Sequence, residues 1–225
     1  GNGKEEGPFS LFTSVPSRAF FPRGFYWDEG FHLLQIMEYD FDLAFVIMSS
    51  WFELIEDSGW IAREVILGDE ARAKVPEEFQ IQNHNIANPP VLLLAFSEML
   101  DRAIKKQEAS SMSYFEGEFN EETSQLENNA DLLIEYAKKI YPKLLRHYQW
   151  FRKSQKGFID EWEDILEDEE LLDNIEIDEM YSWRGRTVDH CLPSGMDDYP
   201  RAQPPDISEL DVDALAWVGV MTRSM

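Results

Sequence analysis

The sequence is poor in cysteine, since Cys191 is the only one among 225 residues. No disulfide can therefore form within the chain, and cysteine content leaves the redox compartment open. No motif of a reactive nucleophile surrounds Cys191, so we expect an inert buried thiol. The fold must depend on a noncovalent core.

Basic residues are also scarce: 20 Lys and Arg stand against 44 Asp and Glu, which gives a net charge of -24. Such a charge repels nucleic-acid phosphates and anionic lipid headgroups. The longest apolar run, residues 43–55, is interrupted by serines and an acid. No N-terminal segment has the basic stretch, apolar run and cleavage site that are typical of a signal peptide. We expect neither nucleic acid nor a membrane as a partner of this segment.

Motifs for metals and cofactors are missing as well. The four histidines, His32, His84, His147 and His190, are scattered, and none forms a helix-spaced metal-binding motif with an acid. The sequence has no glycine-rich phosphate loop and no nucleophile elbow around a serine. We predict that the protein uses neither a metal nor a cofactor.

Apolar residues make up 44% of the chain and aromatic residues 13%, which is enough for a globular core. Apolar positions recur at helical spacing from residue 33, over 42–55, over 91–104, over 130–154 despite Pro142, and from about residue 206. No alternating strand pattern of useful length appears. The predicted fold class is mainly α.

In three segments between these helices, the apolar residues recur at neither helical nor strand spacing. Residues 60–88 mix charged and small residues and are predicted to form a loop. Residues 105–125 are polar and 160–179 strongly acidic, so both are predicted to be surface insertions.

An aromatic segment, residues 20–32, is predicted to form a loop, and it contains one arginine and two acids. Aromatic rings stack on the apolar faces of sugars, and Asp28 and Arg23 can form paired hydrogen bonds with sugar hydroxyls. The alternative is structural: Trp27 is a core residue and Asp28 caps the following helix.

Two adjacent carboxylates, Asp197 and Asp198, lie within residues 192–201, a turn bounded by glycine and proline. Neighbouring like charges resist joint ionisation, so one carboxyl can keep its proton and serve as a general acid. An Asx-type turn explains the same residues without chemistry. The charged loop 60–72 is a weaker signal, because internal ion pairs account for it.

A family resemblance connects these segments. Residues 20–32, 63–72, 87–90, 192–202 and 209–217 resemble, in this order, segments of the eukaryotic processing α-glucosidases of glycoside hydrolase family 63. The matches span nearly the whole chain, and together they are highly specific.

The resemblance implies an (α/α)6 toroid, with residues 1–225 as the N-terminal portion of the catalytic domain and the toroid incomplete in this segment. It implies an inverting exo-glucosidase that removes the terminal α-1,2-linked glucose from the triglucosylated N-glycan of nascent glycoproteins. It further implies location in the lumen of the endoplasmic reticulum, with a membrane anchor outside this segment.

The resemblance also implies roles for individual residues. Asp197 matches the family's general acid, and the general base is expected C-terminal to Met225, so the segment is expected to be catalytically incomplete. Glu209 and Asp213 match a substrate-binding pair, although an acid pair at this helical spacing can equally be structural. The implied substrate contacts are Arg23, Trp27, Asp28, Asp69, Arg72, Trp183, Arg184, Glu209 and Asp213.

Two alternatives remain open. A trehalase-like or bacterial-type α-glucosidase keeps the fold and changes the substrate, although the matches at 63–72 and 192–201 argue against it. A non-catalytic glycan-binding fragment would keep the stacking residues without turnover.

Overall fold

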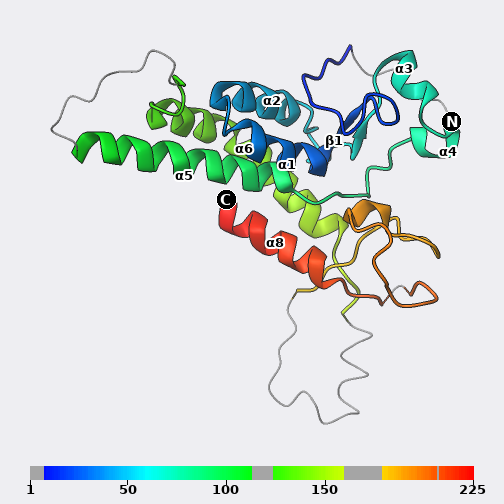
Figure 1. The fold of residues 1–225 in the computed structure, drawn as a ribbon. Helices are drawn as coiled ribbons and strands as arrows, with labels where there is room; N and C mark the ends of the chain where they lie inside the picture. Colours follow the sequence, from blue (N-terminus) through cyan, green and yellow to red (C-terminus); the bar gives the residue numbers. More distant parts are fainter. Residues whose placement is uncertain (1–7, 113–123, 160–178, 207) are drawn as a thin grey trace, which may run out of the picture. The chain divides into compact units, whose positions relative to one another are not determined.

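The computed structural model describes residues 8–112, 124–159, 179–206 and 208–225 (Figure 1). These residues form two compact units. The first unit comprises the described residues up to Leu54, together with Glu64–Gln82 and Val91–Ala137. The second comprises Ile55–Arg63, Asn83–Pro90 and the described part of Lys138–Met225.

Helices dominate both units, which confirms the mainly α fold class. The first unit contains α1 (Tyr26–Ile36), α2 (Phe41–Glu53), α3 (Gly68–Ala73), α4 (Glu77–Gln80) and α5 (Val91–Met112). Helix α6 (Ala130–Ser154) begins in the first unit and ends in the second, which also contains the 3-10 turn η1 (Leu192–Ser194) and α8 (Val212–Ser224). A short antiparallel pair, β1 (Gly24–Phe25) and β2 (Glu64–Val65), completes the first unit.

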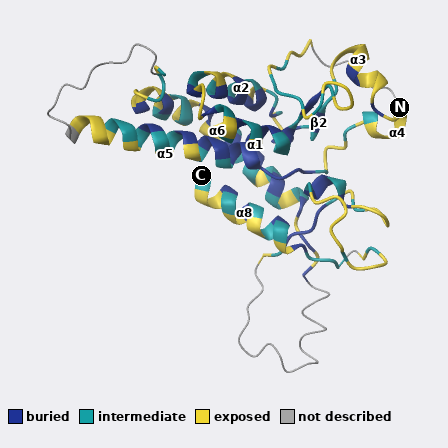
Figure 2. Cartoon of the chain, viewed as in Figure 1, coloured by how far each residue is buried: buried dark blue, intermediate teal, exposed yellow. Residues whose placement is uncertain are grey.

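The core of the first unit lies where α1 packs against α2 and α5. Leu33, Met48, Trp51, Leu92 and Met99 of these helices are almost completely buried. Figure 2 shows buried positions along α1, α2 and α5. Full burial of one such side chain contributes about 1.5–3 kcal/mol. The apolar spacing read from the sequence is thus the spacing that forms this core.

A glycine permits the close approach of α1 and α5. A Cβ atom at Gly30 would lie 2.5 Å from both the backbone carbonyl carbon and the Cβ of Val91. The contact falls on rigid backbone, so a larger side chain cannot be accommodated by rotating a neighbour.

The second unit is organised around buried polar side chains. Gln155 is fully buried and donates to the carbonyl oxygen of Asn85 at 2.8 Å, while its own amide oxygen accepts from the Arg184 N–H at 2.9 Å. His147 is also buried, with Nδ1 2.8 Å from the Gly59 carbonyl oxygen. Burial lowers the pKa of His147 to about 4, so the neutral ring must donate from Nδ1.

The sequence locates two helices well and misplaces one end of three others. Helices α2 and α6 match their predicted ranges, and α6 continues through Pro142. The prediction of a surface connection from residue 105 is wrong up to Met112, because α5 extends that far. Polar groups near its end have specific partners: Lys106 pairs with Glu127 at 2.6 Å, and Gln107 accepts from the Ala130 N–H at 2.7 Å.

Three further predictions need correction. Part of the predicted loop 60–88 is ordered, since β2, α3 and α4 lie within it. The segment 20–32 is not all loop, because α1 begins at Tyr26. The last helix begins at Val212 rather than near residue 206, where the Asp206 carboxylate instead accepts from the Ser208 N–H at 2.8 Å. The predicted insertion at 160–179 lies outside the described residues except for its last residue.

Replacement of Gly30 by alanine should destabilise the protein by about 1–3 kcal/mol, because the new methyl group overlaps Val91. Thermal or urea unfolding of the variant measures the change. Gly219→Ala in α8 is the matched control, since its Cβ would meet no atom of the described residues within 4 Å, and alanine favours helix. Equal stability of the Gly30→Ala variant and the wild type would refute the close packing of α1 and α5.

Candidate functional site

The two adjacent carboxylates lie in a turn braced by its own polar groups, here named the Asp197 turn (residues 192–201). The Ser194 hydroxyl donates to the Cys191 carbonyl oxygen at 2.7 Å and accepts from the Met196 N–H at 3.1 Å. The Cys191 N–H donates to the Asp197 carbonyl oxygen at 3.2 Å. Gly195 has a φ of 76°, a left-handed conformation that glycine adopts without strain.

The Asp197 carboxyl group is exposed at the protein surface, yet neighbouring protein atoms remove part of its hydration. This desolvation is the main reason that the pKa of Asp197 is raised above its ordinary value. The charge of Asp198 raises the pKa further, whereas Arg63 and His190 oppose the rise. The turn therefore presents an accessible carboxyl group that holds its proton to higher pH than a free aspartate.

A buried ion-pair network connects the end of the Asp197 turn to the start of α8. The Arg201 guanidinium pairs with Asp211 and, at 3.0 Å, with Asp213. Trp183 donates its backbone N–H to Asp211 and its indole N–H to Asp213, both at 2.9 Å. Four residues from three chain segments thereby fix one another.

The burial of this network makes it a strong constraint. The side chains of Arg201 and Asp211 are only 7% and 4% exposed. Removing one partner of a buried ion pair costs about 3–5 kcal/mol, because the other charge is left without compensation. Burial raises the pKa of Asp211, and the Trp183 N–H and Arg201 oppose that rise by stabilising the carboxylate.

Glu209 and Asp213 both have protein partners in the second unit. Glu209 pairs with Arg186 at 2.9 Å, and Asp213 receives the Trp183 and Arg201 hydrogen bonds. Trp183 itself is 2% exposed. These contacts favour the structural alternative for the acid pair that the sequence left open.

Arg23 is buried in the first unit, where it pairs with Glu64 at 2.6 Å. Its guanidinium lies over the Phe25 ring at 4.7 Å and the Phe21 ring at 5.6 Å. The β1–β2 register places Phe25 opposite Glu64, which positions the acid near Arg23. This arrangement holds the segment that leads into α1.

Trp27 and Asp28 lie in the first turn of α1, half-buried. Trp27 meets the edge of Phe31 with a distance of 5.4 Å between ring centroids. Phe25 occupies the N-cap position, so the interpretation of Asp28 as the helix cap is wrong. Asp69 and Arg72 are exposed on α3.

The predicted site residues divide between the two units. Arg23, Trp27, Asp28, Asp69 and Arg72 belong to the first unit, whereas Trp183, Arg184, Asp197, Glu209 and Asp213 belong to the second. Sequence reasoning missed the partners Arg63, Glu64, Arg201 and Asp211. All four lie within the matching segments. Arg63, Glu64 and Arg201 carry charges opposite to those of the predicted site residues that they face, Asp197, Arg23 and Asp213. Asp211 had no such signal, because its partners are Trp183 and Arg201.

Within the described ranges, no group of three His, Cys, Asp or Glu side chains is arranged to hold a metal ion. No helix among these residues is both long and apolar enough to cross a bilayer.

Comparison with known proteins gives relatives of high identity. The chain is 73% identical over 231 residues to a mannosyl-oligosaccharide glucosidase of Saccharomyces cerevisiae, covering 100% of this chain and 28% of the relative. It is 48% identical over 224 residues to a probable mannosyl-oligosaccharide glucosidase of Schizosaccharomyces pombe, covering 96% of this chain and 27% of the relative. The chain therefore spans little more than a quarter of the length of these relatives.

A solved structure and a family model complete the comparison. The crystal structure of a family 63 mannosylglycerate hydrolase from Thermus thermophilus aligns with 98% of this chain and 46% of its own, at 15% identity and a TM-score of 0.48. A TM-score this low does not by itself demonstrate a common fold. Residues 2–225 match the model described as the glycosyl hydrolase family 63 C-terminal domain, and the chain therefore belongs to glycoside hydrolase family 63.

Proposed function

We propose that this protein is a mannosyl-oligosaccharide glucosidase that removes the terminal α-1,2-linked glucose from the triglucosylated N-glycan of glycoproteins. The observation that carries the proposal is Asp197, an accessible carboxyl group of raised pKa on a braced turn. It occurs in a family 63 chain with 73% identity to a mannosyl-oligosaccharide glucosidase.

In the proposed mechanism Asp197 is the general acid. Its protonated carboxyl group donates to the glycosidic oxygen as the bond to the terminal glucose breaks, so the remaining glycan leaves as a neutral alcohol. An inverting enzyme needs a second carboxylate that activates water on the opposite face of the sugar, roughly 6.5–9.5 Å from the acid. We assign that base to a residue outside positions 1–225. The product is then β-glucose.

For substrate recognition we assign contact roles to the more exposed residues. The half-buried Trp27 ring offers a stacking surface, and Asp28 beside it can accept hydrogen bonds from paired hydroxyls. Asp69 and Arg72 are exposed and can reach a ligand as side chains of α3. Buried or paired residues are instead assigned to positioning roles within their own unit. Arg23 orders the segment that leads into α1, and Trp183, Glu209 and Asp213 order the loops of the second unit.

Fold and location follow from the same proposal. Family membership supports assigning residues 1–225 to the N-terminal portion of an (α/α)6 toroid. A role in N-glycan processing supports a location in the lumen of the endoplasmic reticulum, in an enzyme anchored by a helix outside these residues. The reaction requires no cofactor, since acid and base catalysis by two carboxyl groups is sufficient.

Asp197→Asn should lower kcat for glucose release by about 10²–10⁴-fold, since the amide keeps the size of the side chain but cannot deliver a proton. Binding of the triglucosylated glycan should be nearly unchanged. The measurement is glucose release by the full-length protein, with NMR identifying the anomer. Asp206→Asn serves as the control, because Asp206 is exposed and its carboxylate bonds only to Ser208 among the described residues.

The outcomes separate the candidate functions. Release of β-glucose that disappears in Asp197→Asn supports the inverting glucosidase. Glycan binding without release by the folded wild type would contradict it and leave a glycan-binding protein. Cleavage of trehalose or short α-glucosides in preference to the N-glycan would favour the trehalase-like or bacterial-type alternative.

The pH dependence of kcat should shift in opposite directions in two charge variants. A general acid acts while protonated, so activity falls as pH rises through its pKa. Arg63→Gln removes a charge that lowers the pKa of Asp197, so the alkaline limb should move to higher pH. Asp198→Asn removes a charge that raises it, so the limb should move to lower pH. Shifts in the same direction would exclude Asp197 as the titrating acid.

Trp27→Ala should weaken glycan binding roughly tenfold, about 1.4 kcal/mol, through loss of stacking area. Isothermal titration with the Asp197→Asn variant as background measures binding without turnover. Trp27→Phe, which keeps an aromatic face, should retain most of the affinity. Normal affinity in a folded Trp27→Ala variant would remove Trp27 from the sugar site.

A further inference from the structure

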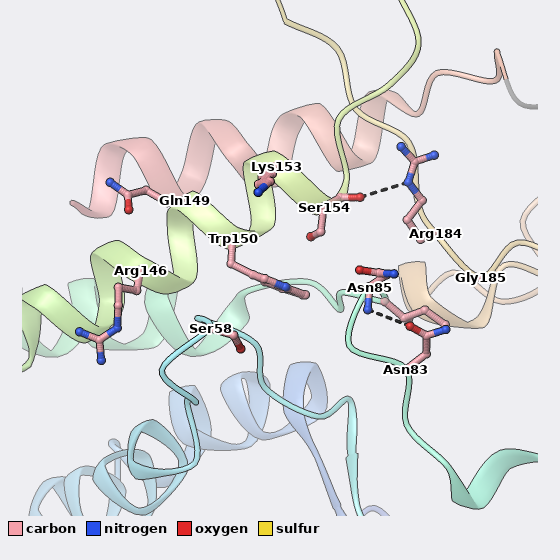
Figure 3. A pocket seen from close by; sticks show the side chains of 11 residues that line it. Ser58, Asn83, Asn85, Arg146, Gln149, Trp150, Lys153, Ser154, Arg184 and Gly185 are labelled. Carbon is pink, nitrogen blue, oxygen red and sulfur yellow. Dashed lines mark hydrogen bonds between the residues drawn. The ribbon is translucent and has the colours of Figure 1, made fainter. Parts of the chain in front are cut away.

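The second unit contains a cavity of about 830 Å³ that does not involve the Asp197 turn (Figure 3). Its walls come from the last part of α6, the loop at residues 83–86, Ser58, and the pair Arg184 and Gly185. No residue of the Asp197 turn lines it. We name it the α6 cavity.

The charge of the α6 cavity is opposite to that of the protein. Arg146, Lys153 and Arg184 line it, and none of its described lining residues is acidic. This is a notable exception in a chain with 44 acidic and 20 basic residues. A local positive potential in an acidic protein favours an anionic ligand at this place.

The three cations lack strong neutralising partners among the described residues. Arg184 donates to the carbonyl oxygens of Ser154, at 3.1 Å, and Lys156, and both are uncharged. Arg146 lies 3.8 Å from the fully exposed Asp57, a distance at which a surface pair is weak.

Two further cationic atoms remain unsatisfied within the described ranges. The Arg146 Nε atom is buried and has no hydrogen-bond partner there. Lys153 is exposed on the last turn of α6 and forms no ion pair with any described residue. An anion that binds in the cavity would supply the charge that these side chains lack.

The uncharged side chains that line the cavity are of the kinds that bind a sugar ring. Trp150 points into the cavity, and its orientation is fixed because the indole N–H donates to the His84 carbonyl oxygen at 3.2 Å and the ring stacks on His147. The side-chain amides of Asn83 and Asn85 are exposed on the loop that the ring approaches. An aromatic surface flanked by amides can bind the apolar face and the hydroxyls of a sugar ring.

Two glycines show that the cavity walls are closely fitted. Gly59 has a φ of 90°, and a Cβ atom there would lie 2.3 Å from the Arg146 carbonyl oxygen and 2.8 Å from the Trp150 Cβ. Gly185 has a φ of 88°, and its Cβ would lie 2.8 Å from Ile86 Cδ1. The loops are therefore held against α6 and against each other in one arrangement.

We propose that the α6 cavity binds a small anionic saccharide, that is, a sugar carrying a phosphate or carboxylate group. Arg146, Lys153 and Arg184 would face the anion, while Trp150 and the amides would face the ring. The proposal is separate from the acid catalysis assigned to Asp197, because no residue of the Asp197 turn lines the cavity. Arg184, which the family resemblance implies as a substrate contact, is assigned to this cavity instead.

The test is isothermal titration of the full-length protein with glucose 6-phosphate, glucuronate, glucose and inorganic phosphate. We expect at least one anionic sugar to bind about tenfold more tightly than both glucose and phosphate, and its affinity to fall as salt is added. The tighter of the two anionic sugars identifies the acidic group. Lys153→Glu should reduce this affinity about tenfold or more, because it reverses a charge that forms no ion pair with any described residue.

Lys139→Glu is the matched control, since Lys139 is also exposed on α6 but does not line the cavity. It makes the same change in net charge and should leave the affinity unchanged. Equal affinity for glucose and the anionic sugars would overturn the proposal. So would equal binding of phosphate alone, equal losses in the two variants, or no binding of either anionic sugar by the folded wild type.

Discussion

The buried pairing of Arg201 with Asp211 and Asp213 is the interaction on which the second unit's site depends. It joins the end of the Asp197 turn, the Trp183 segment and the first turn of α8, three parts that no regular sheet or helix pairing connects. Because Arg201 and Asp211 are nearly inaccessible to water, their charges satisfy one another only in a single geometry. The accessible carboxyl group of Asp197 is therefore presented from a support that has little freedom to move.

The arginine interactions show two ways in which this acidic chain uses its few basic residues. Arg23, Arg186 and Arg201 each pair with a carboxylate in a largely buried setting and thus order loops. Arg184 instead donates to backbone carbonyls and keeps its charge available to the α6 cavity. The planar guanidinium suits both uses, since it can satisfy several acceptors at fixed angles.

The sequence predicted those parts of the fold that depend on local periodicity. Helix α6 has apolar residues at regular helical intervals, and both of its ends were located correctly. The end of α5 was missed because its polar residues are satisfied by distant partners, such as the Ala130 N–H that bonds to Gln107. Helix propensity cannot reveal such a contact, since it is formed only by the tertiary structure.

The same holds for the candidate site: its turn, which depends on local sequence, was predicted, whereas its ion pairs, which depend on tertiary contacts, were not. Gly195 and the surrounding prolines indicated the turn at Asp197 directly. The acid pair Glu209 and Asp213 left two interpretations open, and the contacts with Arg186 and Arg201 favour the structural one. A sequence pattern identifies the charged residues, whereas the pairing between them depends on how the loops meet.

The buried His147 makes the stability of the folded protein depend on the pH of its surroundings. Its buried ring has a pKa of about 4 in the folded state, against an ordinary value near 6.5 when the chain is unfolded. The unfolded chain therefore takes up a proton first as the pH falls, and stability declines from about pH 6.5 down to about pH 4. Delivery to an acidic organelle would thus weaken the unit that carries Asp197, so this histidine can limit the lifetime of the protein outside neutral surroundings.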